Sequence, residues 1–262
     1  MCHLQKTILL MGIDDLYINL ACRTTSKFDE QLHAFEKIDA SGVILKGQVN
    51  DTERIKRIIK DYLAKHKIKI KKIYIALKSE KVMIRYMELP NIPEKELKDA
   101  IYNKLEEEFS YNLSEFVIDY TIGTNSNIMV VIVAEKIIYD YIVICKELGL
   151  TLIKMDIFQN CIAQAFAKAN ENMLLVDKCN DKLNLLYMSD GFIYHSRYIR
   201  SLEYQSVQAK LRQLTNHYGL HTNLRKVCML SEGIDFVSDY FCSIGIQCEV
   251  YPDSDKVCLQ YL

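Results

Sequence analysis

The chain has 262 residues and a formal net charge of −1; 50% of its residues are hydrophobic and 26% are charged. This composition is ordinary for a globular protein, and the length predicts one large domain or two of ordinary size. The near-neutral charge excludes a general nucleic-acid binder, which needs a concentrated basic face. Because no run of about 18 apolar residues occurs, the sequence predicts no direct membrane span.

Nine cysteines are present, an odd number, and none of their spacings is that of a zinc knuckle. They are expected to be reduced and mostly buried, as in a cytosolic protein. The first residues hold one early lysine and a short apolar run, which do not predict a signal peptide.

The first half begins with an apolar hairpin at residues 7–21, whose turn lies between Gly12 and Asp15. A third extended piece is expected at residues 42–46, after a polar stretch. Asp51 or Asn50 is the expected N-cap of a helix in which apolar residues recur at helical spacing. The β-branched run at residues 72–77 predicts a buried strand, so the order is β-β-β-α-β.

A unit marked by prolines follows. Residues 82–89 predict a strand, and Pro90 and Pro93 end it and begin a helix to about residue 109. Two strands at residues 116–122 and 128–134 come next, and a helix follows to residue 148. Residues 82–150 are therefore expected to form an inserted subdomain.

The second half repeats the order of the first. A strand at residues 152–157 and a short helix at 160–168 lead to a second hairpin at 174–188, which contains Asp177. A third strand, a helix at 202–217, and a strand, helix and strand up to residue 251 complete the pattern. Two strand–Asp–turn–strand hairpins about half a chain apart predict an internally duplicated α/β fold.

One stretch is similar to a known family. Residues 88–101 have the sequence ELPNIPEKELKDAI, and Gly12 and Asp14 occupy the first hairpin turn. In these features the chain resembles the PilM family of type IV pilus assembly proteins and, more distantly, FtsA. The resemblance implies an actin-like (ribonuclease H-like) duplicated fold with an inserted strand–helix–strand–strand subdomain. It implies a first actin-like subdomain at residues 1–81 and 151–170, an FtsA-like 1C (SHS2-type) insertion at 82–150, and a reduced second subdomain at 171–262.

In actin-like ATPases the paired hairpins grip the phosphates of ATP, and the positions here that match are Gly12, Asp14, Asp177 and Gly233. The family's loop glycines and hydroxyls are replaced by Asp15-Leu16-Tyr17 and by residues 178–180. Phosphate loops need glycine so that backbone N–H groups can approach oxygen closely. The segment between residues 197 and 227 is also too short for the subdomain that covers one side of the nucleotide in the family. A pseudo-ATPase without a cofactor is therefore expected, with Asp14 and Asp177 as ordinary turn residues or remnants of a magnesium site.

The resemblance also implies a partner. In the family, a short cytoplasmic peptide of the bitopic membrane protein PilN docks between the first and inserted subdomains. The positions here that match this junction between the subdomains are Tyr86, Met87, Leu89, Pro90 and Pro93. The expected function is a non-catalytic bacterial scaffold in a type IV pilus or related secretion machine, with other pilus assembly subunits as further partners. The expected location is cytoplasmic, peripheral at the inner face of the cell membrane.

Other interpretations remain open at this point. The chain could be an active actin-like ATPase or kinase with atypical phosphate loops that uses ATP and magnesium, or an FtsA-like filament. His217 and His221 could bind a metal, but Gly219 between them favours two surface histidines, and no metal site is expected. The basic run at residues 65–72 could contact anionic lipid or an acidic partner, or be a solvated helix end.

Overall fold

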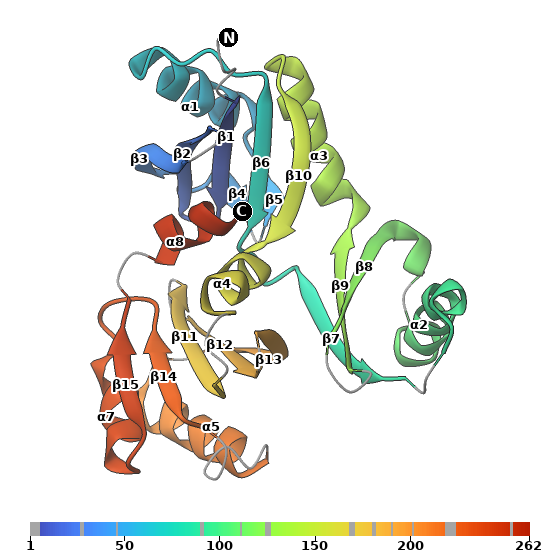
Figure 1. The fold of residues 1–262 in the computed structure, drawn as a ribbon, viewed down its shortest axis with the longest axis vertical. Coiled ribbons are helices and arrows are strands. Elements are labelled where there is room, and N and C mark those ends of the chain that lie inside the picture. The colour runs from blue at the N-terminus through green and yellow to red at the C-terminus, as the bar shows by residue number, and fades with distance from the viewer. Residues whose placement is uncertain are drawn as a thin grey trace.

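The computed structural model describes residues 6–26, 29–45, 47–89, 92–110, 112–123, 127–167, 171–179, 182–189, 191–200, 202–217, 224–251 and 254–262. These residues form two five-stranded sheets, one three-stranded sheet and a two-stranded ribbon. The two larger sheets lie at opposite ends of the molecule, and the three-stranded sheet stands beside them (Figure 1).

The first sheet has the strand order β10-β6-β1-β2-β3. Its strands are β1 (Lys6–Ile13), β2 (Tyr17–Thr25), β3 (Glu30–Asp39), β6 (Lys72–Leu77) and β10 (Thr151–Ile157). β1 and β2 form the predicted antiparallel hairpin, and β6 runs parallel to β1 and to β10. The ribbon of β4 (Ile44–Leu45) and β5 (Gln48–Val49) leads into α1 (Thr52–Lys65). Asp51 caps α1 as predicted, since its carboxylate accepts the N–H of Arg54 at 2.9 Å.

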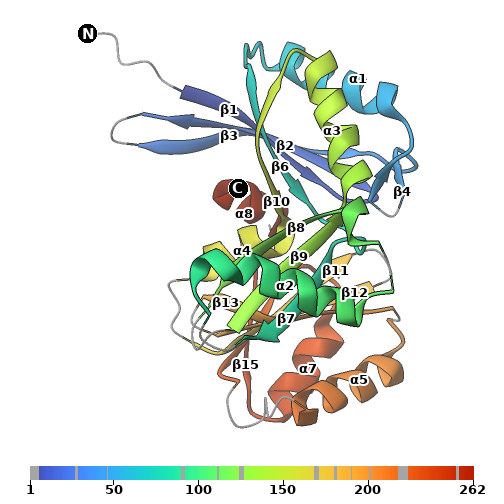
Figure 2. The ribbon, with the colours of Figure 1, turned by 90° about the vertical axis from the view of Figure 1, so that its right-hand side faces the viewer.

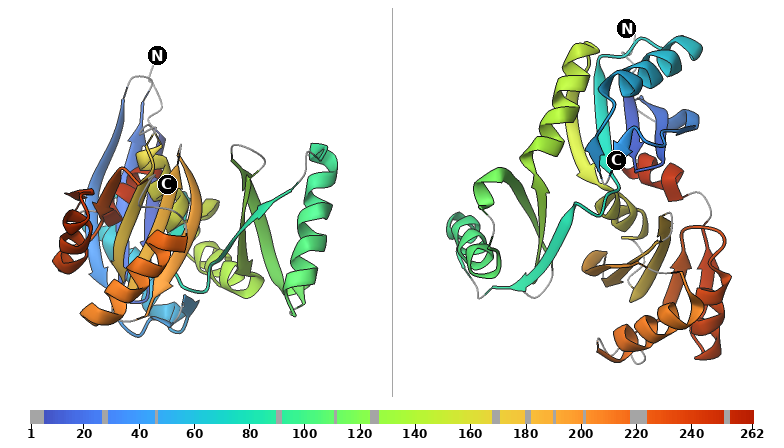
Figure 3. Two further views of the ribbon diagram at one scale, coloured as in Figure 1. Left: turned by 90° about the horizontal axis from the view of Figure 1, so that it is seen from below. Right: turned by 180° about the vertical axis from the view of Figure 1, so that it is seen from behind.

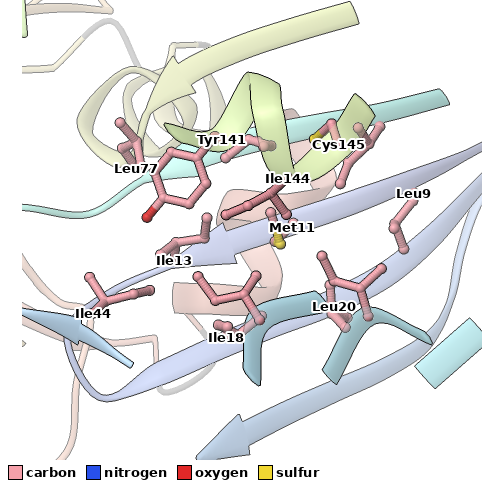
Figure 4. Packing of buried hydrophobic residues seen from close by; sticks show 14 of the residues in the cluster. Leu9, Met11, Ile13, Ile18, Leu20, Ile44, Leu77, Tyr141, Ile144 and Cys145 are labelled. Atoms are coloured by element: carbon pink, nitrogen blue, oxygen red, sulfur yellow. The ribbon is translucent and has the colours of Figure 1, made fainter. Parts of the chain in front are cut away.

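The side chains of β1 alternate between two cores. Leu9, Met11 and Ile13 pack under α1 and α3 (Glu135–Glu147), as Figure 4 shows for Tyr141 and Ile144 of α3. Leu10 points to the other face, which α4 (Phe158–Phe166) and α8 (Ser254–Tyr261) cover. Figure 2 shows α1 and α3 together on one side of this sheet. This period of two is the one expected for a strand buried on both faces.

The inserted unit is a three-stranded sheet with the order β7-β9-β8 and one covering helix. It contains β7 (Met83–Glu88), α2 (Glu94–Glu108), the 3-10 turn η1 (Leu113–Glu115), β8 (Phe116–Ile122) and β9 (Asn127–Ala134). Leu97, Ile101 and Leu105 of α2 pack on one face of the sheet, and α2 is the outermost element on that side (Figure 3). The sequence assigns α3 to this unit, but its buried residues lie in the core of the first sheet.

The second sheet repeats the first with the order β13-β12-β11-β14-β15. Its strands are β11 (Met173–Cys179), β12 (Lys182–Ser189), β13 (Phe192–Ile199), β14 (Lys226–Met229) and β15 (Gln247–Val250). Helices α5 (Tyr204–His217) and α7 (Asp235–Ser243) cover its outer face, and α4 and α8 lie between the two halves. In both sheets the first three strands form a meander and two parallel strands follow, so the predicted duplication is present.

Two elements differ from the sequence prediction. The third strand of the first sheet lies at Glu30–Asp39 and not at residues 42–46, and α8 was not predicted at all. Seven cysteines in the described residues are free thiols, and five of them are buried. Along the described parts of the chain, none of the helices combines the length and apolar character needed to cross a bilayer.

Candidate functional site

The turn of the first hairpin binds its own carboxylate. Asp14 accepts the N–H groups of Leu16 and Tyr17 at 2.7 and 2.6 Å. Asp15 accepts the N–H of Gly47 at 2.8 Å. A phosphate loop directs such N–H groups at an anion, whereas here two of the turn's N–H groups already have an internal partner.

The second hairpin is bound by a lysine from the first half. Asp177 is 0% exposed, and its Oδ2 lies 2.8 Å from Nζ of Lys78, which follows β6 directly. Its Oδ1 accepts the hydroxyl of Ser231 at 2.7 Å. Nearby, Lys182 of β12 donates to Glu80 at 2.8 Å. The loop after β6 therefore joins the two halves through these two ion pairs and a longer one between Glu80 and Arg200 at 4.0 Å.

Lys78 also faces carboxylates of the first hairpin and of α8. Its Nζ lies 3.6 Å from Asp255 and 4.4 Å from the ring centre of Phe158. Burial raises the pKa of Asp14, although Lys78 and the backbone N–H groups of the turn oppose this rise. Burial would also raise the pKa of Asp255, but Lys78 and Lys37 together hold that pKa below its ordinary value. The ammonium of Lys78 thus partly compensates the charges of Asp14, Asp177 and Asp255, and Lys37 adds a second cation at Asp255.

Little space remains between the hairpins. The cavity beside Gly12, Asp14, Lys78 and Asp255 has a volume of about 10 Å³, close to the minimum for one water molecule. A Cβ on Gly12 would lie 3.4 Å from Leu259, so α8 covers this glycine. A cavity of this size does not fit a magnesium nucleotide in this arrangement.

The third predicted element serves the second hairpin. The hydroxyl of Ser231 accepts the N–H of Lys178 at 3.0 Å in addition to donating to Asp177. Gly233 has a φ of +72° and lies against the side chain of Lys178. Within the described residues no three His, Cys, Asp or Glu side chains are grouped to hold a metal; His221 lies outside those residues.

The residues predicted for partner binding do not form one open surface. Met87 is buried against α2, and Leu89 packs beside the same cluster. Pro93 is exposed at the N-cap of α2, and Pro90 lies outside the described residues. Tyr86 points to the other face of the sheet, where its ring lies 5.8 Å from that of His195 in β13. Its hydroxyl is buried, and burial raises its pKa.

That other face of the inserted sheet is partly open. Register places Tyr86, Met129 and Thr121 in one row across the three strands. The β7 side of the face is covered by β13 and α4, whereas the β8 side lines a groove of about 120 Å³. The groove lies between β8 and β9 on one side and α3, β10 and α4 on the other. The predicted residue Tyr86 thus lies on the same sheet face as the groove but not in its lining, which comes partly from β8.

The groove is largely apolar and has an acidic rim. Its apolar lining includes Val117, Val131, Ile138 and Met155. Asp119 also lines it, and within the described residues no cation lies within 4 Å of this carboxylate to form an ion pair. Such a groove suits an extended apolar segment with a cationic group.

Solved structures share this fold. The chain superposes on a structure described as the PilM-PilN type IV pilus biogenesis complex with a TM-score of 0.77 and 15% identity, covering 95% of this chain and 88% of that one. A Bacteroides thetaiotaomicron protein with an actin-like ATPase fold and unknown function gives 0.65 at 10% identity, with 98% and 96% covered. The cytoplasmic domain of EpsL, an inner membrane component of the Vibrio cholerae type II secretion system, gives 0.63 at 10% identity, with 98% and 94% covered. The fold is actin-like, as predicted.

Sequence comparison with curated proteins finds no match. The family model described as type IV pilus assembly protein PilM matches residues 16–186. This range contains the first hairpin's second strand, the whole inserted unit and most of the second hairpin. The chain therefore belongs to the PilM family of type IV pilus assembly proteins.

Proposed function

We propose that the chain is a non-catalytic scaffold subunit of a type IV pilus or related secretion machine, which binds a short cytoplasmic peptide of a PilN-like bitopic membrane protein. The groove between the inserted sheet and the first half is the observation that carries this proposal. Family membership supports it, as does the likeness to a structure described as a PilM–PilN complex. Other pilus assembly subunits would bind elsewhere, and the protein would work in the cytoplasm at the inner face of the membrane.

The lining of the groove limits the peptide that fits. The groove has room for one or two anchoring side chains. Val117 and Met155 favour aliphatic anchors, because burying a large aliphatic side chain contributes about 1.5–3 kcal/mol. Asp119 at the rim favours a lysine, an arginine or a terminal amine beside the anchor. The peptide proposed is therefore short, extended, and both aliphatic and basic.

Two residues of one strand give a matched test. Val117 lines the groove and is 42% exposed, whereas Ile122 points to the opposite side of β8 and is 53% exposed. Because both side chains are already partly solvated, we expect glutamate to leave the fold intact at both positions. Isothermal titration with the cytoplasmic tails of candidate partners should show at least about tenfold weaker binding for Val117→Glu, about 1.4 kcal/mol, and no change for Ile122→Glu. Equal effects of the two variants, or no binding of any tail to the wild-type protein, would refute the proposed site.

The alternative function is an active actin-like ATPase or kinase with atypical loops. The ion pair of Lys78 with Asp177 and the cavity of about 10 Å³ favour the non-catalytic role. A ligand at about 100 times its dissociation constant adds roughly 2.7 kcal/mol to the free energy of unfolding. We expect millimolar Mg-ATP to leave the melting temperature unchanged. A clear rise in that temperature, or release of phosphate, would favour the alternative.

A further inference from the structure

The segment from the end of α1 to the first residue of β6 exposes four lysines. Ile68 and Ile70 pack against the core of the first half. Lys67, Lys69, Lys71 and Lys72 are exposed, and we call these four residues the lysine edge. From residue 67 to residue 71 exposed lysines alternate with partly buried isoleucines, and Lys72 extends this strip of exposed ammonium groups by one residue.

The lysine edge is not neutralised by neighbouring acids. Within the described residues none of its four lysines lies within 4 Å of a carboxylate. Two acids on adjacent elements already have other partners: Glu36 pairs with Lys65 at 2.8 Å, and Glu147 with Lys56 at 2.6 Å. The whole chain carries a net charge of −1. The four lysines contribute +4, so the remaining residues carry a net charge of −5.

Backbone geometry does not explain a lysine at the start of this strip. Lys67 has a φ of +54°, and Ile68 donates its N–H to Leu63 at 2.9 Å to close α1. Glycine is favoured at such a helix end because a Cβ crowds the backbone in the left-handed region. α3 ends in this way with Gly149 at a φ of +69°. Lysine is therefore not the residue that this backbone conformation favours. The property that lysine adds at position 67 is its positive charge.

We propose that the lysine edge contacts the anionic headgroups of a lipid bilayer. It lies at the end of the first sheet farthest from the second half (Figure 1), so a flat surface can approach it. The four lysines line neither the cavity between the hairpins nor the groove. Flexible ammonium groups without a shaped pocket suit mobile phosphates better than the fixed carboxylates of a folded partner.

The expected interaction is weak and electrostatic. A lysine near an anionic membrane surface contributes about five-fold in affinity, and the effect decays within about 10 Å at moderate salt. Four lysines give binding at roughly millimolar lipid, enough to orient the protein but not to anchor it. The groove lies at the other end of β6, near Leu77, so the lipid contact leaves the groove accessible.

Sedimentation with sucrose-loaded vesicles tests this contact with the full chain and no partner. We expect binding to vesicles that contain phosphatidylglycerol, no binding to phosphatidylcholine alone, and release by added salt. The double variant Lys69→Glu with Lys71→Glu should bind at least about 20-fold more weakly. The same change at Lys95 and Lys98, exposed lysines on α2, is the matched control and should leave binding unchanged.

The variant Lys67→Gly separates the effect of the positive charge on vesicle binding from any effect on folding stability. Glycine suits the left-handed conformation, so the variant should be at least as stable as wild type while it loses about five-fold in vesicle binding. No binding of the wild-type protein to anionic vesicles would overturn the proposal. An acidic protein segment would then be the favoured partner of the lysine edge. An equal loss in the α2 control would overturn it too. Because the assay contains no peptide, its result is independent of the proposed function.

Discussion

Replacing Lys78 with methionine tests whether an internal cation holds the two halves together. Methionine keeps the length and most of the volume of the side chain but removes the ammonium. Asp177, 0% exposed, then loses the group 2.8 Å from its Oδ2, and Asp255 loses a cation at 3.6 Å. Its contact with Ser231 remains, so Asp177 stays hydrogen-bonded but without a countercharge.

The expected loss is large. Removing one partner of a buried ion pair costs about 3–5 kcal/mol, because the other charge stays buried without compensation. Ser231 and the small adjacent cavity reduce this cost, so we expect Lys78→Met to lower the free energy of unfolding by about 3 kcal/mol at pH 7. Lys37→Met is the control: Lys37 pairs with Asp255 at 2.8 Å but is 45% exposed, and such surface pairs contribute at most about 1 kcal/mol.

The loss should shrink in acid. Lys78 lowers the pKa of both Asp14 and Asp255, so both pKa values rise when it is removed. A carboxyl whose pKa is higher in the folded than in the unfolded state binds more protons when folded, so stability rises as pH falls. The difference between wild type and Lys78→Met should therefore narrow between pH 7 and about pH 4, the unfolded pKa of aspartate.

Urea unfolding at a series of pH values measures these differences. The double variant Lys78→Met with Asp177→Asn removes the orphaned charge and should recover at least about half of the loss, because a pair removed together is often nearly neutral. A loss below about 0.5 kcal/mol for Lys78→Met, typical of an unremarkable surface site, would refute the internal-cation argument. A double variant no more stable than the single one would refute it as well.

Four further substitutions test local features by thermal or urea unfolding. Gly47→Ala should lower the free energy of unfolding by about 2–3 kcal/mol. Residue 47 has a φ of +78°, and the new Cβ would lie 2.1 Å from Oγ of Ser79. Gly149→Ala is the comparison: its Cβ would have no atom within 4 Å, so the free energy of unfolding should fall by only about 1 kcal/mol. Tyr86→Phe removes a buried hydroxyl that has no hydrogen-bond partner among the described residues, so stability should be unchanged or higher; a loss above about 1 kcal/mol would show that the hydroxyl is bonded. Asp51→Ala removes the N-cap of α1 and should lose about 1 kcal/mol.

Turn residues, N-caps and apolar spacing predicted those helices and strands that are stabilised mainly by interactions between residues close in sequence. The hairpin at β1 and β2, the capped helix α1 and the four-residue spacing in α2 all agree with the structure. β3 was missed because its side chains are mostly exposed or half-buried, so it has little apolar periodicity. α8 was missed because it spans only eight residues and is buried by docking on α4 and β1, which no local pattern reveals.

The site was less predictable than the fold. Asp14, Asp177 and Gly233 lie at the hairpin junction, as the duplication implied. Lys78 was missed because a single lysine after an apolar strand is ordinary in a sequence, and only the assembled structure places it against Asp177. The sequence indicated partner-binding positions on and after β7 and none on β8. Both strands contribute to the same sheet face, and a linear sequence does not show that β13 covers its β7 side while the β8 side lines a groove.

Contacts within the protein join the two halves and the inserted sheet that borders the groove. Here the Lys78–Asp177 and Glu80–Lys182 pairs connect the halves from within. The inserted unit adds a third connection, since a Cβ on Gly123 would lie only 2.8 Å from the ring of Phe192 in β13. These contacts hold the first half, the second half and the inserted sheet against one another, so the two walls of the groove are kept in position from within the chain.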